Sequence, residues 1–162
     1  LCNDVVVVLN DAEQWPQLRA RHIADIYPNA AALGGIYSGL SAANNKRALV
    51  VACDMPFLKL ELLSFLIHYP AVYDALIPRS TMPEEMRKLL GVEPLHALYS
   101  KACLPVLQAR LNARQLHITG FFSAVPTLFV EPHEYSHLDP QGRSFLNLNT
   151  AAQLEMLKDV FL

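Results

Sequence analysis

The stretch Ala48-Leu49-Val50-Val51-Ala52-Cys53-Asp54-Met55-Pro56-Phe57 decides the fold of this 162-residue chain. Its first six residues are small or apolar, which is typical of a strand buried on both faces of a parallel sheet. Asp54 ends that run, and Pro56 cannot donate a hydrogen bond to a sheet ladder. In open sheets of this kind, ligands bind beyond the carboxyl ends of the strands. The stretch therefore predicts a buried strand with a carboxylate at the ligand-binding edge.

Outward from this stretch, apolar runs and helical patterns alternate along the chain. Further strands are expected at residues 5–9, 22–26, 75–77, 95–99 and 127–130. Helices are expected at residues 15–20, from 34 onward, at 59–68, at 104–111 and from about 151, with a polar loop at 78–93. Such alternation predicts one α/β domain over residues 1–162, with three layers: a mostly parallel sheet and helices on both of its faces, joined by right-handed crossovers.

The composition limits the class of protein. Apolar residues make up 52% of the chain and charged residues 17%, which excludes a disordered tail or linker. The formal net charge of -2, without a basic run, disfavours nucleic acid and anionic membrane surfaces as partners. No apolar run approaches the ~20 residues of a membrane-spanning helix. Three cysteines without Cys-x-x-Cys spacing argue against a disulfide framework and favour a reducing cytoplasm.

Asp54 is the first candidate for chemistry. A carboxylate fixed just past a buried strand can hold a divalent cation against phosphate oxygens. Mg²⁺ suits such a site because it takes one or two carboxylates and completes its octahedron with phosphates and waters. The alternative is that Asp54 caps the turn before Pro56. The neighbouring Cys53 is expected to be buried in the strand, where it is a poor nucleophile.

A pair of glycines marks the second candidate, the segment Leu33-Gly34-Gly35-Ile36. Two glycines that open a helix let the backbone approach a ligand closely, and free amides there favour an anion or the edge of a base. The segment matches neither the dinucleotide-binding fingerprint nor a Walker loop. A tight loop-to-helix junction explains the two glycines equally well.

Polar side chains supply the remaining candidates. Asn147 and Asn149 alternate along Phe145-Leu146-Asn147-Leu148-Asn149-Thr150, so both fall on one face of an extended segment. Neutral amides there can order metal-bound water or phosphate. Alternatively, Asn149 or Thr150 is the N-cap of a final helix. His96 either contacts a substrate phosphate or satisfies a hydrogen bond in the core.

Five segments in this order resemble the molybdenum cofactor guanylyltransferases, also called molybdopterin-guanine dinucleotide synthases. That family shows an Asp, a Pro-Leu-x-Gly loop leading into a helix, then Cys-Asp-x-Pro, His/Glu-Pro-Leu and Asn-x-Asn-Thr. The matching positions here are Asp25 and residues 33–36, 53–56, 93–95 and 147–150. Any one motif is weak, whereas five in register along nearly the whole chain are specific. The resemblance implies a nucleotidyltransferase fold of the doubly wound, Rossmann-like kind.

The resemblance also implies roles for particular residues. Asp54 is expected to be the catalytic residue that binds Mg²⁺ with the triphosphate. Asn147 and Asn149 are expected to assist the metal or the molybdopterin phosphate, and residues 78–95 to face the pterin. Residues 33–35 are expected to line the guanine pocket. The implied nucleotide contacts are Asn10, Asp25, Leu33, Gly34, Gly35 and Asp54.

The implied reaction is attack of the molybdopterin terminal phosphate on the α-phosphorus of GTP, which transfers GMP and releases pyrophosphate. Mg²⁺ is the implied cofactor, and no covalent enzyme intermediate is required. GTP and molybdopterin are the implied partners, together with molybdoenzyme-maturation proteins. Two other hypotheses stay open: a related nucleotidyltransferase that uses CTP or a sugar phosphate, and a degenerate domain of the same fold that binds a partner without catalysis.

Two features depart from the family pattern. Ala32 stands where the family has Pro, which loosens the loop without removing its glycines. Family members also begin with a strand running into Leu-Ala-Gly-Gly and a loop that wraps the triphosphate, and nothing like it precedes residues 5–9 here. The strands at 5–9 and 48–53 are therefore expected to flank a gap, with two exposed edges. We expect the chain to be an N-terminally incomplete form of a longer protein.

Overall fold

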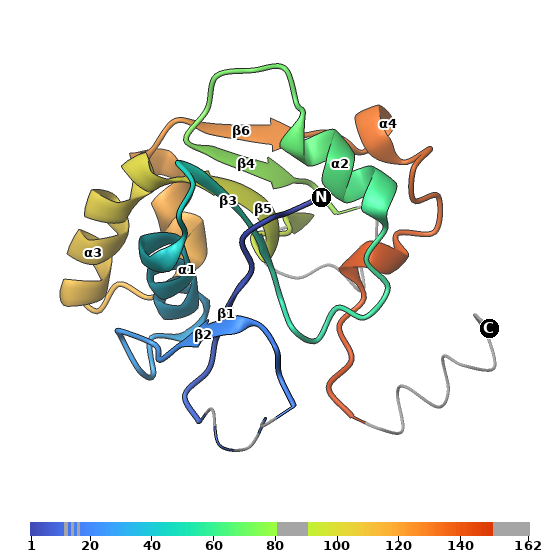
Figure 1. The fold of residues 1–162 in the computed structure, drawn as a ribbon. Coiled ribbons are helices and arrows are strands. Elements are labelled where there is room, and N and C mark those ends of the chain that lie inside the picture. Colours follow the sequence, from blue (N-terminus) through green and yellow to red (C-terminus); the bar gives the residue numbers. More distant parts are fainter. Residues whose placement is uncertain (12, 14, 16, 81–90, 151–162) are drawn as a thin grey trace.

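The computed structural model describes residues 1–11, 13, 15, 17–80 and 91–150 of the chain, and Figure 1 shows how its elements are arranged. The strands are β1 (Val6–Val8), β2 (Arg21–Ile23), β3 (Arg47–Val51), β4 (Ala75–Pro78), β5 (His96–Ser100) and β6 (Thr127–Val130). The α-helices are α1 (Ala31–Ala42), α2 (Leu60–Ile67), α3 (Leu104–Asn112) and α4 (Pro132–Tyr135). Short 3-10 helices lie at Lys101–Cys103, Ile118–Ala124 and Arg143–Phe145. None of the helices in these ranges is long and apolar enough to cross a membrane.

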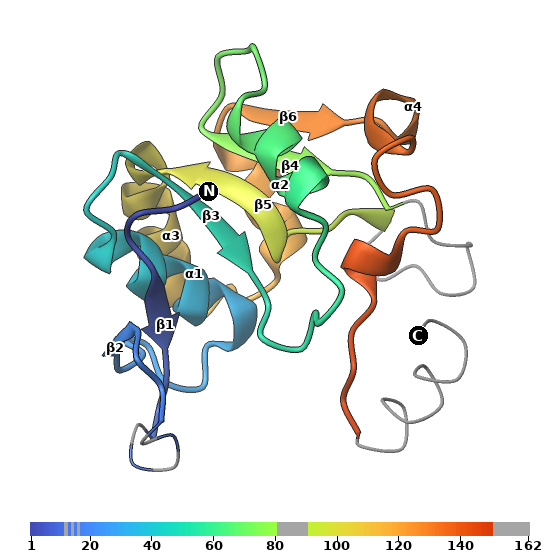
Figure 2. The same cartoon turned by 45° about the vertical axis from the view of Figure 1, so that its right-hand side comes forward.

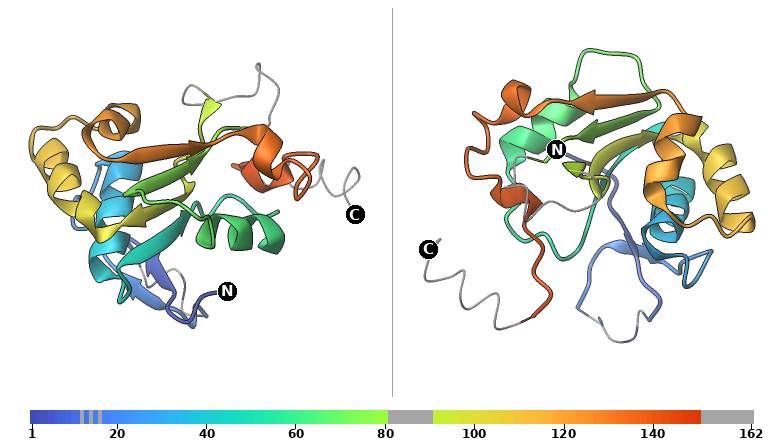
Figure 3. Two further views of the ribbon diagram at one scale, coloured as in Figure 1. Left: turned by 90° about the horizontal axis from the view of Figure 1, so that it is seen from above. Right: turned by 180° about the vertical axis from the view of Figure 1, so that it is seen from behind.

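Helices cover both faces of the larger sheet, as the view from above shows (Figure 3). On one face, α1 and α3 contribute Leu33, Ile36 and Leu107 to an apolar cluster with the sheet. On the other face, α2 contributes Leu62 and Leu66 to a second cluster. Each helix thus buries one apolar stripe against the sheet. The predicted α/β fold of three layers is confirmed.

The strands fall into two sheets (Figure 2). β1 pairs with β2 in parallel, and the larger sheet has the order β3-β5-β4-β6. Within the larger sheet, β5 is antiparallel to both neighbours, whereas β4 and β6 are parallel. The larger sheet is therefore mixed, because β5 reverses the direction that simple alternation suggests.

β1 and β3 are not paired with each other in the described part of the chain, and each pairs with a strand on one side. Helix α1 packs against both strands and spans the space between them. A Cβ placed on Gly39 of this helix would lie 3.5 Å from Cγ2 of Val8. The predicted separation of the two strands is confirmed. It also explains why β1 is only half-buried rather than fully buried, and why Val5 is 56% exposed.

Three local expectations have different outcomes. The helix expected at residues 15–20 is absent from the described residues of that segment, which form turns and irregular backbone. So short a helix needs tertiary packing, and Trp15 is 53% exposed. β3 ends at Val51, two residues earlier than predicted, so Cys53 lies in the following turn and is exposed rather than buried. The helix expected from about residue 151 lies outside the described residues.

Candidate functional site

Polar residues lie two or three positions after the ends of the first three strands. Asn10 follows β1 and is exposed, Asp25 follows β2, and Asp54 follows β3. Because β1 and β2 are parallel, and the arrowheads of β1 and β3 point to the same side in Figure 2, these residues lie along one edge of the fold. This edge is where ligands bind in open α/β sheets. This edge is therefore the candidate site.

The carboxylate of Asp54 is bound on one side only. Asn147, 93 residues away in sequence, donates from Nδ2 to Oδ2 of Asp54 over 2.9 Å. The backbone N–H of Leu148 donates to the carbonyl oxygen of Asp54 over 2.8 Å. The other carboxylate oxygen of Asp54, Oδ1, is buried and has no hydrogen-bond partner within the described ranges. The structure thus brings together two of the predicted site residues and leaves one buried acceptor atom unsatisfied.

An unsatisfied buried carboxylate oxygen is costly, and a divalent cation is a partner that removes the cost. No cluster of three or more His, Cys, Asp or Glu side chains that could hold a metal occurs among the residues that the structure describes. Asp54 therefore suits an ion that takes few protein ligands and completes its shell with phosphates and water, which is the habit of Mg²⁺. The interpretation of Asp54 as a turn cap alone leaves its Oδ1 unexplained.

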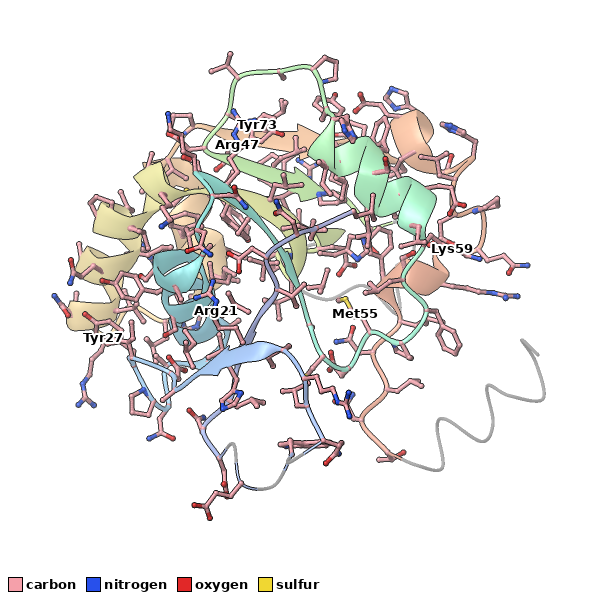
Figure 4. All side chains as sticks on the ribbon, viewed as in Figure 1. Arg21, Tyr27, Arg47, Met55, Lys59 and Tyr73 are labelled. Carbon is pink, nitrogen blue, oxygen red and sulfur yellow. The ribbon has the colours of Figure 1, made fainter. Side chains whose placement is uncertain are left out.

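Further hydrogen bonds hold the segment that carries Asn147. The carboxylate of Asp139 accepts from the backbone N–H groups of Arg143 at 3.2 Å and Ser144 at 2.8 Å. The hydroxyl oxygen of Ser144 accepts from the backbone N–H of Lys59, at the start of α2, over 3.1 Å. Met55, labelled with Lys59 in Figure 4, is only 5% exposed and anchors the turn after β3. Both chain segments of the Asp54 site are therefore fixed by contacts outside it.

His96 lies behind this site, at the start of β5 and opposite Val51 of β3. Its side chain is fully buried, and its ring packs edge-to-face on Phe145, with centroids 5.0 Å apart. Neither ring nitrogen has a hydrogen-bond partner among the described residues. Burial lowers the pKa of His96 to about 4, although the nearby Asp139 carboxylate acts in the opposite direction. The full burial of the ring fits the expected core histidine and does not support the expected contact with a substrate phosphate.

The two glycines of the second candidate segment have different surroundings. A Cβ on Gly34 would lie 2.8 Å from the carbonyl oxygen of Tyr27 and 3.0 Å from Oδ2 of Asp25. Gly34 is therefore required by the close packing of the loop after β2 on α1. A Cβ on Gly35 would meet no atom within 4 Å, so this backbone faces open space. The junction explains Gly34, whereas only Gly35 is open to a ligand.

Leu33 and Asp25, both expected to contact the nucleotide, also make contacts within the protein. The side chain of Leu33 is fully buried in the core beneath α1, so only its backbone can line a nucleotide pocket. Oδ1 of Asp25 accepts hydrogen bonds from the backbone N–H of Tyr27 at 3.0 Å and from Oγ of Ser38 at 2.7 Å. In Figure 4, Arg21 marks the first residue of β2 and Tyr27 lies in the loop between β2 and α1. Sequence analysis missed Ser38, although a polar residue among the apolar positions of a helix is a detectable signal.

Asn149 and the segment expected to face the pterin stay predictions, and the structure gives only their surroundings. Asn149 lies on the exposed part of its segment. Of the segment expected to face the pterin, the structure describes residues 78–80 and 91–95. There Arg79, at the carboxyl end of β4, donates from Nε to Glu131 over 2.8 Å and places its guanidinium over the ring of Phe129.

Comparison with known proteins shows the family of this chain. The model of the MobA-like NTP transferase domain family matches residues 1–123. A protein of Chloroflexus aggregans named "Probable molybdenum cofactor guanylyltransferase" is 40% identical over 158 residues, covering 98% of this chain and 74% of the relative. The molybdenum cofactor guanylyltransferase of Desulfosudis oleivorans is 30% identical over 156 residues, covering 96% and 73%.

A solved structure has the same fold. The molybdopterin-guanine dinucleotide biosynthesis protein A of Archaeoglobus fulgidus matches with a TM-score of 0.77 and 25% identity, covering 96% of this chain and 77% of that one. Sequence, fold and the arrangement of strand-end residues thus lead to one family. This chain belongs to the MobA-like NTP transferase domain family and is a nucleotidyltransferase.

Proposed function

We propose that this protein transfers GMP from GTP to molybdopterin and releases pyrophosphate, as a step in molybdenum cofactor biosynthesis. The observation that carries the proposal is the half-satisfied carboxylate of Asp54, held by Asn147 at the carboxyl end of β3 in an NTP transferase fold. The names of the relatives support guanylyl transfer in particular.

Mg²⁺ is the cofactor that fits these residues. Oδ1 of Asp54 is the buried acceptor that would hold the ion, and the hydrogen bond from Asn147 keeps the carboxylate turned toward it. When bound, Mg²⁺ neutralises charge on the phosphates. Asn149 follows two residues after Asn147 and is exposed, and we propose that its amide assists a phosphate group of either substrate.

GTP is the proposed donor, bound at the edge formed by the first three strands. The open backbone at Gly35 gives the nucleotide a surface that it can approach closely. Asn10 and Asp25, at the ends of β1 and β2, are the proposed polar contacts. Leu33 and Gly34 support this surface from below, since both are buried.

The proposed transfer makes one P–O bond and breaks another. The terminal phosphate oxygen of molybdopterin attacks the α-phosphorus of GTP, and the bond from that phosphorus to the bridging oxygen breaks as pyrophosphate leaves. The contribution of the protein is to hold both phosphates in line and to stabilise the charge that develops, so no covalent enzyme intermediate is needed. We infer that the reaction takes place in the cytoplasm and that molybdoenzyme-maturation proteins receive the product.

A transfer assay tests the proposal. The protein is incubated with molybdopterin, Mg²⁺ and α-labelled GTP, and both pyrophosphate release and label in the product are measured. CTP and UTP replace GTP in parallel reactions, and a chelator removes the metal. We expect transfer with GTP and Mg²⁺ only. Transfer with CTP alone would reject guanylyl specificity, and an absence of nucleotide binding would favour a non-catalytic domain of this fold.

A further inference from the structure

A buried serine connects the loop after β2 to helix α1. Ser38 is fully buried, and its Oγ donates to Oδ1 of Asp25 over 2.7 Å. The same oxygen accepts from the backbone N–H of Ile26 over 2.9 Å. Oδ1 of Asp25 also accepts from the backbone N–H of Tyr27 over 3.0 Å. One carboxylate oxygen and one hydroxyl group thus organise three consecutive residues at the end of β2.

These contacts divide the Asp25 carboxylate into a structural and an available oxygen. Oδ1 already accepts two hydrogen bonds, whereas the structure gives Oδ2 no hydrogen bond from the described residues. Oδ2 lies beside the first turn of α1, because a Cβ on Gly34 would come within 3.0 Å of it. The next residue, Gly35, faces open space. Oδ2 therefore lies at the first turn of α1, one residue from the open backbone of Gly35.

We propose that Ser38 is a positioning residue for nucleotide recognition, whose hydroxyl fixes Asp25 so that Oδ2 accepts a hydrogen bond from the nucleoside. This inference rests on the proposed function, which places a nucleotide at the same edge. Ser38 itself does not touch the ligand, because it is fully buried. Its effect is to hold the carboxylate in one orientation before binding, which lowers the entropy lost when the nucleoside binds.

The partner of Oδ2 is a neutral donor group. A carboxylate oxygen accepts from N–H or O–H, and a hydrogen bond to a charged acceptor is stronger than a neutral one. Guanosine presents such donors on the base, at N1 and the 2-amino group, and on the ribose hydroxyls. Inosine triphosphate lacks the 2-amino group, whereas 2′-deoxy-GTP and 3′-deoxy-GTP each lack one hydroxyl. Each analogue should bind the wild type more weakly than GTP if the group that it lacks is the donor. Disturbing Asp25 should then abolish the difference between GTP and that one analogue, which identifies the donor.

Substitutions at Ser38 test the positioning role. Ser38→Ala removes the hydroxyl, Ser38→Thr retains it, and Ser41→Ala is a matched control on the same helix, outside these contacts. We expect Ser38→Ala to raise KM for GTP about ten-fold, to change kcat by less than about two-fold, and to reduce discrimination against one analogue. Ser38→Thr should restore KM, and Ser41→Ala should match the wild type.

Asp25→Asn covers the case in which Ser38→Ala does not fold. The amide oxygen can still accept at the Oδ1 position, while the amide nitrogen replaces the acceptor at Oδ2 by a donor. We expect this variant to fold and to bind GTP at least about ten-fold more weakly by calorimetry. Unchanged affinity in Asp25→Asn, or unchanged analogue ratios in a folded Ser38→Ala, would overturn the inference while the proposed function stands. A wild-type protein that binds no nucleoside triphosphate would overturn both.

Discussion

The regions around Asp25 and Asp54 both bury polar atoms, but they differ in whether those atoms have hydrogen-bond partners. Both aspartates lie shortly after a strand, at the same edge of the fold. Around Asp25, buried polar atoms pair with one another, as the bonds to Ser38 and Tyr27 show. Around Asp54, Oδ1 and both ring nitrogens of His96 are buried without partners among the described residues.

The difference lies in how each carboxylate is held: Oδ1 of Asp25 accepts two hydrogen bonds, whereas Oδ1 of Asp54 is buried with no partner among the described residues. A satisfied network rigidifies its surroundings, whereas an unsatisfied buried acceptor favours any ligand that completes it. A cation bound to Oδ1 of Asp54 would remove the cost of this unsatisfied acceptor, so we expect the region to favour binding of a cation with its phosphates. Substitutions in the two regions should affect different measurements.

The largest expected effect is on turnover, in Asp54→Asn. The substituted amide can still accept the hydrogen bond from Asn147, so we expect the fold to be retained. Loss of the carboxylate removes the ligand for Mg²⁺, and transfer at saturating GTP should fall by about a thousand-fold or more. Asp25→Asn should instead raise KM and leave kcat within a few-fold. Initial rates over a range of GTP and Mg²⁺ concentrations separate the two, and similar turnover in Asp54→Asn and wild type would remove the metal assignment.

A smaller effect, on stability, is expected from His96 as the pH falls. Burial lowers its pKa in the folded protein to about 4, against 6.5 in the unfolded chain, so the unfolded state binds more protons between these values. Stability is therefore complete above about pH 6.5 and decreases as pH falls toward 4, by about 3 kcal/mol in total. Urea unfolding between pH 7 and 4 measures this loss.

The matched variant for this measurement is His96→Phe, which retains a ring against Phe145 and has no proton to gain. Its stability should fall less steeply over the same pH range than that of the wild type. The difference between the two losses is the contribution of His96. The carboxylates titrate in both proteins, so the difference between the two curves isolates His96. Parallel curves would show that the ring is not buried in its neutral form in solution.

Adjacent glycines give the third prediction, because one supports the Asp25 region and the other faces open space. Gly34→Ala places a Cβ 2.8 Å from a backbone oxygen of Tyr27, which must move, and we expect a net loss of about 1–2 kcal/mol. Gly35→Ala meets no atom within 4 Å and gains helix propensity, so stability should rise by up to about 1 kcal/mol. Chemical denaturation measures both.

GTP affinity gives a second comparison of the two glycine variants. If the open backbone at Gly35 is the surface on which the nucleotide lies, Gly35→Ala should weaken GTP binding even though it stabilises the fold. A more stable Gly35→Ala that binds GTP as tightly as the wild type would place the nucleotide elsewhere. Equal stability of the two variants would contradict the different packing of the two glycines.

Much of the fold follows from the sequence because buried strands and amphipathic helices have distinct periodicities. The strand at β3, the helix at α3 and the separation of β1 from β3 were all predicted. The reversal of β5 was not, although the polar segment at 78–93 lacked the crossover helix that parallel neighbours require. The absent helix at residues 15–20 shows that a capping pattern is insufficient without a face to bury.

The sequence names the residues of the candidate site, whereas the contacts that hold them come only from the structure. Strand ends locate Asp54, and the motif locates Asn147, but the hydrogen bond between them depends on tertiary packing across 93 residues. The contrast between Gly34 and Gly35 depends on the carbonyl oxygen of Tyr27, which no local pattern reveals. The choice between the two interpretations of His96 also depends on tertiary packing, because its ring is buried by β3 and Phe145 together.

The smallest expected effect concerns Ala31, the first residue of α1, which follows the loop that carries Asp25. Its backbone conformation is strained. Ala31 has φ of 50°, a left-handed conformation that costs an L-residue about 1–2 kcal/mol. Ala31→Gly removes that strain but adds freedom to the unfolded chain, so we expect a net gain of about 0.5–1 kcal/mol. Ala32→Gly, one residue further into α1, lacks the strain and should lose about as much. Thermal unfolding should separate the two variants by a few degrees in Tm. Equal destabilisation by both would mean that Ala31 is not left-handed in solution, and that the loop before α1 is looser than the contacts of Asp25 indicate.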